Sequence, residues 1–184
     1  MYLKLNHFCL LLMPVLILGS SFNYTNCDQA KQPKFLSSCC HVQWHDKTSN
    51  SCRESLLREK GQLDKVELHA CMAECLFKIR GYFLSNGSVN VEAMQRNYQQ
   101  QYKNDSTMSQ LISHSLNICT DYARKRSEQF QWMSSKGQCD YLPATLMACI
   151  MEQVYENCPA SRWKISDDCQ AMRKYLLACD DVKS

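Results

Sequence analysis

Apolar residues recur every three or four positions along most of the chain, and polar residues fill the positions between them. This spacing places the apolar side chains along one face of an α-helix, where they can pack against a core. No segment shows the strict alternation of apolar and polar residues that is typical of a half-buried strand. The pattern therefore predicts an all-α protein with six or seven helices. The ranges with helical spacing are 68–83, 91–102, 108–122, 147–154 and 169–179.

Capping residues indicate where several of these helices begin. Asp64, followed three residues later by Glu67, is typical of a capping box. Asn90 and Ser166 are suited to the N-cap position of two later helices. A shorter helix is expected over residues 52–59, ahead of a glycine.

The first 21 residues have the pattern of a secretory signal peptide. Lys4 precedes an apolar run over residues 10–18, and small residues follow at 19–21. The run is much shorter than the roughly 20 residues that a membrane-spanning helix needs. We therefore expect cleavage after Ser21, with Ser20 as the alternative position, release of a single domain over residues 22–184 to the outside of the cell, and no membrane span.

Cysteine is unusually frequent in this chain. The chain has 13 cysteines, and all but Cys9 follow the predicted signal peptide. Cysteines in an even number after a signal peptide predict disulfides, because the secretory route is oxidising. The paired C-x2-C knuckles of structural zinc sites are absent from the sequence. We therefore expect disulfides rather than a metal site.

Charge gives no indication of a polyanionic partner. The formal net charge of the chain is only +3, with both signs mixed along it. The densest basic cluster, residues 124–126, is three residues long and is followed closely by Glu128. Short clusters of this kind are typical of solvated helix faces, so nucleic-acid binding is not expected.

The spacing of the cysteines is more informative than their number. Cys71 and Cys75 are four residues apart, so in a helix both sulfurs lie on one side and can bond two different segments. Cys149 and Cys158 enclose eight residues, and Pro159 follows directly. The other cysteines after the signal peptide are Cys27, Cys39, Cys40, Cys52, Cys119, Cys139, Cys169 and Cys179.

This arrangement resembles the insect odorant-binding proteins of the Plus-C group. The C-x3-C at Cys71 and Cys75 and the C-x8-C at Cys149 and Cys158 bracket Cys119, as in that family. The added Cys139, the proline after Cys158 and the further cysteines towards both ends resemble the Plus-C pattern, and the likeness spans residues 27–179. The resemblance implies a helical shell around an apolar cavity that carries odorants, pheromones or similar small hydrophobic molecules.

The resemblance also implies three core disulfides, Cys52–Cys75, Cys71–Cys149 and Cys119–Cys158. Cys39 or Cys40 could take the place of Cys52. The pairing of the remaining cysteines is left open, because the sequence offers no basis for choosing among the connectivities. These remaining cysteines are Cys27, Cys39, Cys40, Cys139, Cys169 and Cys179.

With these bridges, three apolar stripes would face a common interior. The stripes lie within residues 68–83, 108–122 and 147–154. Their apolar members are the predicted lining of a ligand pocket. The predicted pocket residues are Met72, Leu76, Ile79, Leu111, Ile112, Leu116, Met147, Ile150 and Val154.

An alternative function is a secreted, disulfide-rich protein-interaction module that binds no small molecule. Besides a small apolar ligand, a receptor or a second copy of the chain is a candidate partner. The two hypotheses differ in the saturable uptake of apolar probes, which only a carrier would show.

An enzyme is not expected. Cys39-Cys40 followed by His45-Asp46 has some likeness to secreted phospholipases A2, but the histidine lies two residues too far on and residues 27–38 contain no glycine for a calcium loop. Without calcium ligands, nothing would stabilise an oxyanion. His41 and His45 lack an identifiable third metal ligand, and His114 falls on a polar helix face. We therefore predict no catalytic residue, no cofactor and no metal.

Three sequons are candidates for N-glycosylation. They begin at Asn23, Asn86 and Asn104.

Overall fold

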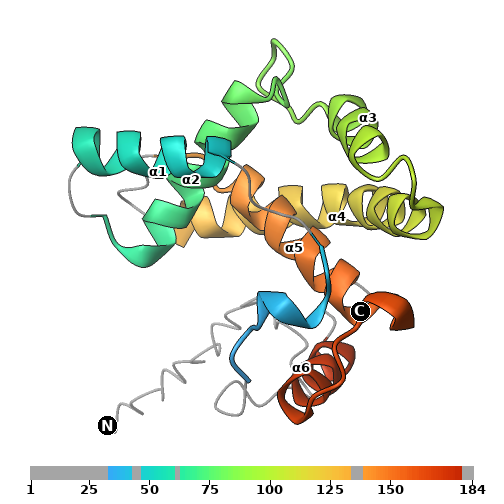
Figure 1. Ribbon diagram of the computed structural model, residues 1–184. Helices are drawn as coiled ribbons and strands as arrows, with labels where there is room; N and C mark the ends of the chain where they lie inside the picture. Colours follow the sequence, from blue (N-terminus) through green and yellow to red (C-terminus); the bar gives the residue numbers. More distant parts are fainter. Residues whose placement is uncertain (1–32, 43–46, 61–62, 134–138, 180–184) are drawn as a thin grey trace, which may run out of the picture.

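The computed structural model describes residues 33–42, 47–60, 63–133 and 139–179 (Figure 1). Within these ranges the chain forms six α-helices and two short 3-10 helices, and two isolated bridges take the place of strands. The all-α prediction is therefore confirmed. No helix in the described ranges is long and apolar enough to cross a membrane. The α-helices are α1 (Lys47–Lys60), α2 (Lys65–Ile79), α3 (Val91–Gln101), α4 (Ser106–Met133), α5 (Leu142–Glu156) and α6 (Asp167–Ala178), and the 3-10 helices are η2 (Ser37–Cys39) and η3 (Ala160–Arg162).

Helix α5 lies at the centre of the arrangement. It crosses and packs against α4, and it also contacts α2 and α6 (Figure 1). Helix α1 packs on α2, and α3 packs on α4. Figure 1 shows α6 and the segment that begins at residue 33 beside each other, below the layer formed by the other helices.

The predicted N-caps are confirmed at three helices. The Asp64 carboxylate accepts hydrogen bonds from the N–H groups of Val66 and Glu67, both at 2.9 Å. The Asn90 side chain accepts from Ala93 N–H, and Ser166 Oγ accepts from Cys169 N–H. Each cap satisfies a backbone donor that the first turn of a helix leaves free.

Several helix boundaries differ from the predicted ranges; α4 continues to Met133 and α5 begins at Leu142. Helix α2 ends at Ile79 instead of continuing to Phe83. Gly81 has a φ of 66°, which favours glycine, and Tyr82 N–H then donates to Phe77 O at 2.9 Å, so the chain reverses direction. Helix α1 begins at Lys47, ahead of the predicted start at residue 52.

The buried apolar residues form two clusters instead of one common interior. The smaller cluster joins α1, α2 and the start of α5 through Leu56, Ala70, Cys71, Cys139 and Tyr141. The larger cluster joins α3, α4, α5 and α6, and it also includes Phe77 from the end of α2 and the adjacent Cys39 and Cys40. Its fully buried aliphatic and methionine side chains are Met94, Met108, Ile112, Leu116, Leu146, Ile150, Val154 and Met172.

The disulfides confirm one predicted bridge and correct two. Cys52–Cys75 is present. Cys71 bonds Cys139, and Cys119 bonds Cys149, so the predicted Cys71–Cys149 and Cys119–Cys158 bridges are wrong.

The physical reason for the correction is where the helices meet. Cys139 precedes α5 and lies where α2 packs on it, so the Cα atoms of Cys71 and Cys139 are 5.1 Å apart. Cys149, in the middle of α5, faces Cys119 of α4, with a Cα separation of 5.7 Å. As expected, Cys71 and Cys75 bond different segments.

The adjacent pair Cys39 and Cys40 ties the N-terminal part of the described chain to its C-terminal part. Cys39 bonds Cys169 of α6, and Cys40 bonds Cys158 just after α5. Cys179 is also disulfide-bonded, and Cys27 lies outside the described residues.

Polar contacts reinforce this junction of the two ends. Tyr155 Oη donates to Ser37 O at 2.8 Å. Arg173 of α6 donates to the carbonyls of Glu156 and Cys158, both at 3.0 Å, at the C-terminal end of α5. A cation there satisfies free carbonyls and interacts favourably with the helix dipole. Helix α6 is therefore held to the end of α5 directly by these hydrogen bonds, and covalently through the Cys39–Cys40 segment.

Tyr141 and Glu67 form a buried polar contact between α2 and the start of α5. Tyr141 Oη donates to Glu67 Oε2 at 2.7 Å, and Glu67 is only 6% exposed. We predict that Tyr141→Phe lowers the free energy of unfolding by about 1–3 kcal/mol, because it removes a donor from a buried carboxylate. Denaturant unfolding with the disulfides intact measures this. Tyr175→Phe on the partly exposed side of α6 is the matched control, and an equal loss in both variants would contradict the prediction.

Candidate functional site

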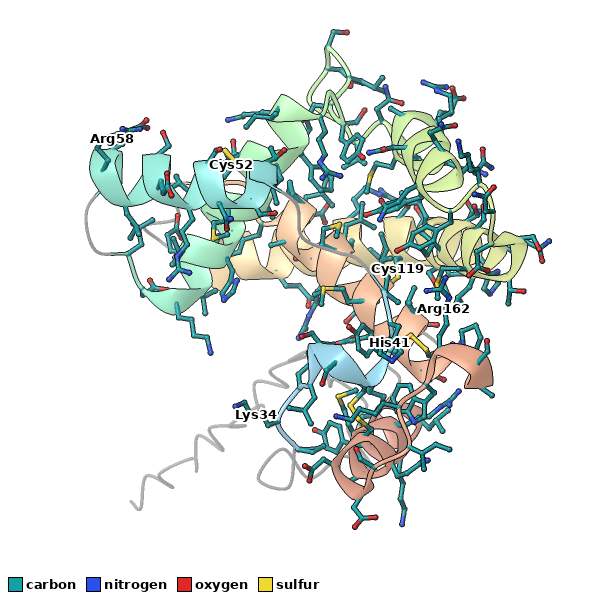
Figure 2. The ribbon with its side chains drawn as sticks, viewed as in Figure 1. Lys34, His41, Cys52, Arg58, Cys119 and Arg162 are labelled. Carbon is teal, nitrogen blue, oxygen red and sulfur yellow. A yellow bond between two sulfur atoms is a disulfide. The ribbon has the colours of Figure 1, made fainter. Side chains whose placement is uncertain are left out.

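An open groove of about 740 Å³ lies where the N-terminal part of the described chain meets the turn between α3 and α4. Three stretches of sequence form it: residues 37–42, residues 101–105, and Arg162 of η3. Figure 2 shows the labelled side chains of His41 and Arg162 close together at this junction. The lining residues are Ser37, Ser38, Cys40, His41, Val42, Gln101, Tyr102, Lys103, Asn104, Asp105 and Arg162.

An ion pair between Asp105 and Arg162 fixes one wall of the groove. Arg162 Nε and Nη2 both approach Asp105 Oδ2, at 2.8 and 2.5 Å. Arg162 Nη1 also donates to His41 O at 2.6 Å. One guanidinium therefore links the start of α4 to the N-terminal segment, and its rigid fork of donors suits this task.

Asp105 has a second role as the cap of α4. Its Oδ1 accepts a hydrogen bond from Met108 N–H at 2.9 Å. This backbone hydrogen bond and the neighbouring Arg162 lower the pKa of the Asp105 carboxyl below its usual value, because both favour the charged form. The carboxylate is thus held ionised at the mouth of the groove.

Backbone pairing holds the N-terminal segment against η3. Cys40 forms an antiparallel bridge with Trp163. His41 N–H donates to Arg162 O at 3.0 Å, and Lys164 N–H donates to Cys39 O at 2.8 Å. The groove therefore has a framework of disulfides, backbone hydrogen bonds and one ion pair.

The lining combines apolar surface with polar groups. The buried Tyr102 and the half-buried Val42 offer apolar surface. Lys103 and Asn104 are exposed at the turn between α3 and α4 and offer hydrogen-bond donors. Such a lining suits a small molecule with an apolar body and a polar group.

None of the predicted pocket residues lines this groove. Six of them belong to the larger core cluster: Leu111, Ile112, Leu116, Met147, Ile150 and Val154. Met72 packs on the smaller cluster, and Leu76 is half-buried. Ile79 is 60% exposed at the end of α2, so its expected place in an interior pocket is wrong. The nine residues therefore do not converge on one site.

Sequence reasoning missed the groove because its residues come from turns and short segments. Residues 37–42, 103–105 and 162 carry no amphipathic helical pattern, residues 101 and 102 lie at the very end of one, and the three stretches are far apart in the chain. The signal that could have placed them together is the pairing of Cys39 and Cys40 with Cys169 and Cys158. That pairing was left open by the sequence.

The other candidate chemistry finds no support in the described residues. His114 is exposed on α4, as expected, and His45 and Asp46 lie outside the described ranges. One described group could hold a metal by its geometry, Glu67 with Cys71 and Cys139. The two sulfurs are bonded to each other, so they are not available as thiolate ligands.

Comparisons with known proteins give a consistent family. Residues 33–175 match the family described as AgamOBP47-like. General odorant-binding protein 68 of Anopheles gambiae is 27% identical over 150 residues, which cover 78% of this chain and 69% of the relative. Odorant-binding protein 47 of the same species is 20% identical over 148 residues, which cover 76% of this chain but only 60% of the relative.

The Asp105–Arg162 ion pair generates a prediction about pH. A folded-state pKa below the ordinary 3.8 means that the carboxylate stabilises the fold well above that pH, and that this contribution is lost as the pH falls through the lowered pKa. Asp105→Asn keeps an N-cap but removes the charge, so we expect destabilisation at pH 7 that disappears as the pH falls through the lowered pKa of Asp105. Denaturant unfolding across pH is the measurement. Asp121→Asn removes the exposed Asp121–Arg124 pair and should change little; identical pH profiles for the two variants would contradict the prediction.

Proposed function

We propose that this protein, which belongs to the AgamOBP47-like family of insect odorant-binding proteins, is a secreted carrier of small hydrophobic molecules such as odorants or pheromones. The observation that carries the proposal is the family match over residues 33–175, which includes every element that forms the groove. The relatives are named as odorant-binding proteins, and a disulfide-bonded helical shell suits a protein that works in an oxidising fluid.

We further propose that the groove is the ligand site. Its volume of about 740 Å³ falls within the roughly 300–1,000 Å³ of typical small-molecule sites. The apolar body of a ligand would lie on Val42 and Tyr102, and its polar group would face Lys103 or Asn104. Burying apolar surface contributes about 25 cal/mol per Å², which after the cost of association leaves an affinity on the order of micromolar.

The interior is the second location to test. Leu111 and Met147 are only partly buried at the edge of the larger cluster, and Tyr98 Oη donates to the Met147 sulfur at 3.7 Å. The fully buried Ile112, Leu116 and Ile150 would have to move apart to admit a ligand, which close packing opposes.

A titration with an apolar fluorescent probe tests the carrier role and locates the site. We expect saturable uptake by the wild-type protein and at least a tenfold weaker uptake by Val42→Lys, because an ammonium group placed in the groove resists desolvation. Ile165→Lys is the matched control, since Ile165 is 87% exposed and lies outside the groove. This variant should bind as the wild type does.

The same titration distinguishes the alternatives. If Leu116→Ala changes uptake and Val42→Lys does not, the ligand occupies the interior. If natively folded, correctly bridged protein takes up no probe, the carrier role fails, and a protein-interaction module with a receptor or a second copy of the chain as partner becomes the better function.

Secretion is tested separately, because residues 1–21 lie outside the described ranges. We expect the released protein to begin at Phe22, after cleavage at the small residues 19–21. N-terminal sequencing or intact mass of the secreted protein measures this. A protein that keeps the apolar run over residues 10–18 would contradict the prediction.

A further inference from the structure

The two sequons in the described chain have different local geometry. The Asn86 sequon lies in a small hairpin between α2 and α3, where Leu84 N–H donates to Ser88 O at 2.8 Å and Gly87 N–H donates to Leu84 O at 2.9 Å. Asn86, Gly87 and Ser88 are all exposed, and Gly87 has a φ of 82° that suits glycine at the tip. The whole sequon is therefore accessible to another protein.

Within this hairpin the hydroxyl of the sequon already contacts the acceptor amide. Ser88 Oγ donates to Asn86 Oδ1 at 2.7 Å, and Ser88 N–H donates to the same oxygen at 3.0 Å. Two donors on Oδ1 polarise the carboxamide, and Asn86 Nδ2 has no hydrogen-bond partner among the described residues. The nitrogen is thus free to bond a sugar.

The Asn104 sequon is held in a different arrangement. Its middle residue, Asp105, caps α4 through Met108 and pairs with Arg162. Its third residue, Ser106, is the first residue of α4. In the described chain Asn104 receives no hydrogen bond from the Ser106 hydroxyl. The helix and its cap therefore oppose the turn that the Asn86 sequon forms.

We propose that Asn86 is an N-glycosylation site and that Asn104 remains unmodified. In this reaction Asn86 Nδ2 forms a bond to C1 of the first sugar of a lipid-linked oligosaccharide. The bond between C1 and the oxygen of the lipid diphosphate breaks, and the diphosphate leaves with the electron pair. One amide proton passes to a base of the transferase. The inference rests on the secretion included in the proposed function, since the donor and the transferase belong to the secretory route.

The hairpin can form in time for the modification. Its backbone contacts join residues at most eight positions apart, from Tyr82 to Asn90. Hairpins form in about 1–10 μs, whereas synthesis adds only about 5–20 residues per second. The stretch between Cys75 and Cys119 contains no cysteine, so no disulfide has to form within it first. The turn is therefore sampled while the chain is still being made.

The position of Asn86 keeps a glycan away from the groove. The hairpin precedes α3, whereas the groove residues 101–105 follow the end of that helix (Figure 1). The 11 residues of α3 separate the two by about 16 Å at 1.5 Å per residue. A glycan on Asn104 would instead lie on the groove itself, because that residue is part of the lining.

Expression of the full chain in a secreting insect cell line tests the proposal. Peptide mapping after peptide-N-glycosidase treatment in heavy-oxygen water should mark Asn86 as a modified position and leave Asn104 unmarked. Asn86→Gln and Ser88→Ala should each lower the intact mass by one glycan, whereas Ser88→Thr should keep it. Asn104→Gln is the matched control and should leave the glycan mass unchanged.

The outcomes are distinct. A secreted protein with unmodified Asn86, or with a glycan on Asn104, would overturn the inference. Probe uptake measured on the same samples reports on the carrier role independently, so a protein that binds probe without a glycan on Asn86 overturns only the glycosylation. An unmodified protein retained inside the cell would overturn both the inference and the secretion on which it rests.

Discussion

The packing of α5 against α4 is the contact on which the rest of the molecule depends. Ile112 and Leu116 of α4 and Ile150 and Val154 of α5 are all fully buried. Burying each of these side chains stabilises the fold by about 1.5–3 kcal/mol. The contact between α4 and α5 therefore supplies a large part of the hydrophobic stabilisation. The Cys119–Cys149 bridge fixes the two helices at its middle. Helices α2, α3 and α6 then take their places on one or the other of these two helices.

The peripheral elements are too small to hold themselves in place, and covalent links compensate for this. Helix α6 has 12 residues, and the N-terminal part of the described chain has only a 3-10 turn. The Cys39–Cys169 bridge joins residues 130 positions apart, and such a bridge typically stabilises a fold by about 2–4 kcal/mol. The junction stays assembled without a large core of its own, and its edge leaves room for a groove.

The core and the groove differ in how they are built. The core is closely packed, which favours a rigid scaffold over a site that must open. The groove lies on turns that this scaffold positions, a common arrangement for binding residues. Arg162 shows how the two are coupled, because its guanidinium holds together the α4 cap and the N-terminal segment. Under the proposed function, changes in these turns would alter the groove without repacking the helices.

The sequence could predict the features that depend on neighbours within a few positions. The helical class and the caps at Asp64, Asn90 and Ser166 were predicted correctly. The Cys52–Cys75 bridge, which the family resemblance implied, is also present. The family resemblance, read from the cysteine spacing, is confirmed by the comparisons. The end of α2 at Ile79 was missed because the reversal after Gly81 outweighs the apolar spacing that continues to Phe83.

By itself, then, the sequence determined which segments are helical, that the cysteines of the described residues form disulfides, and to which family the chain belongs. Only the tertiary structure decided that Cys71 meets Cys139, that Cys149 faces Cys119, and that the groove forms between residues 37–42, 101–105 and Arg162. The reason is physical. Local spacing fixes which side of a helix a residue lies on. Which cysteine it bonds depends on where along α5 each other helix packs. That position is set by the fit of whole side-chain surfaces between segments 30 to 130 residues apart in the sequence.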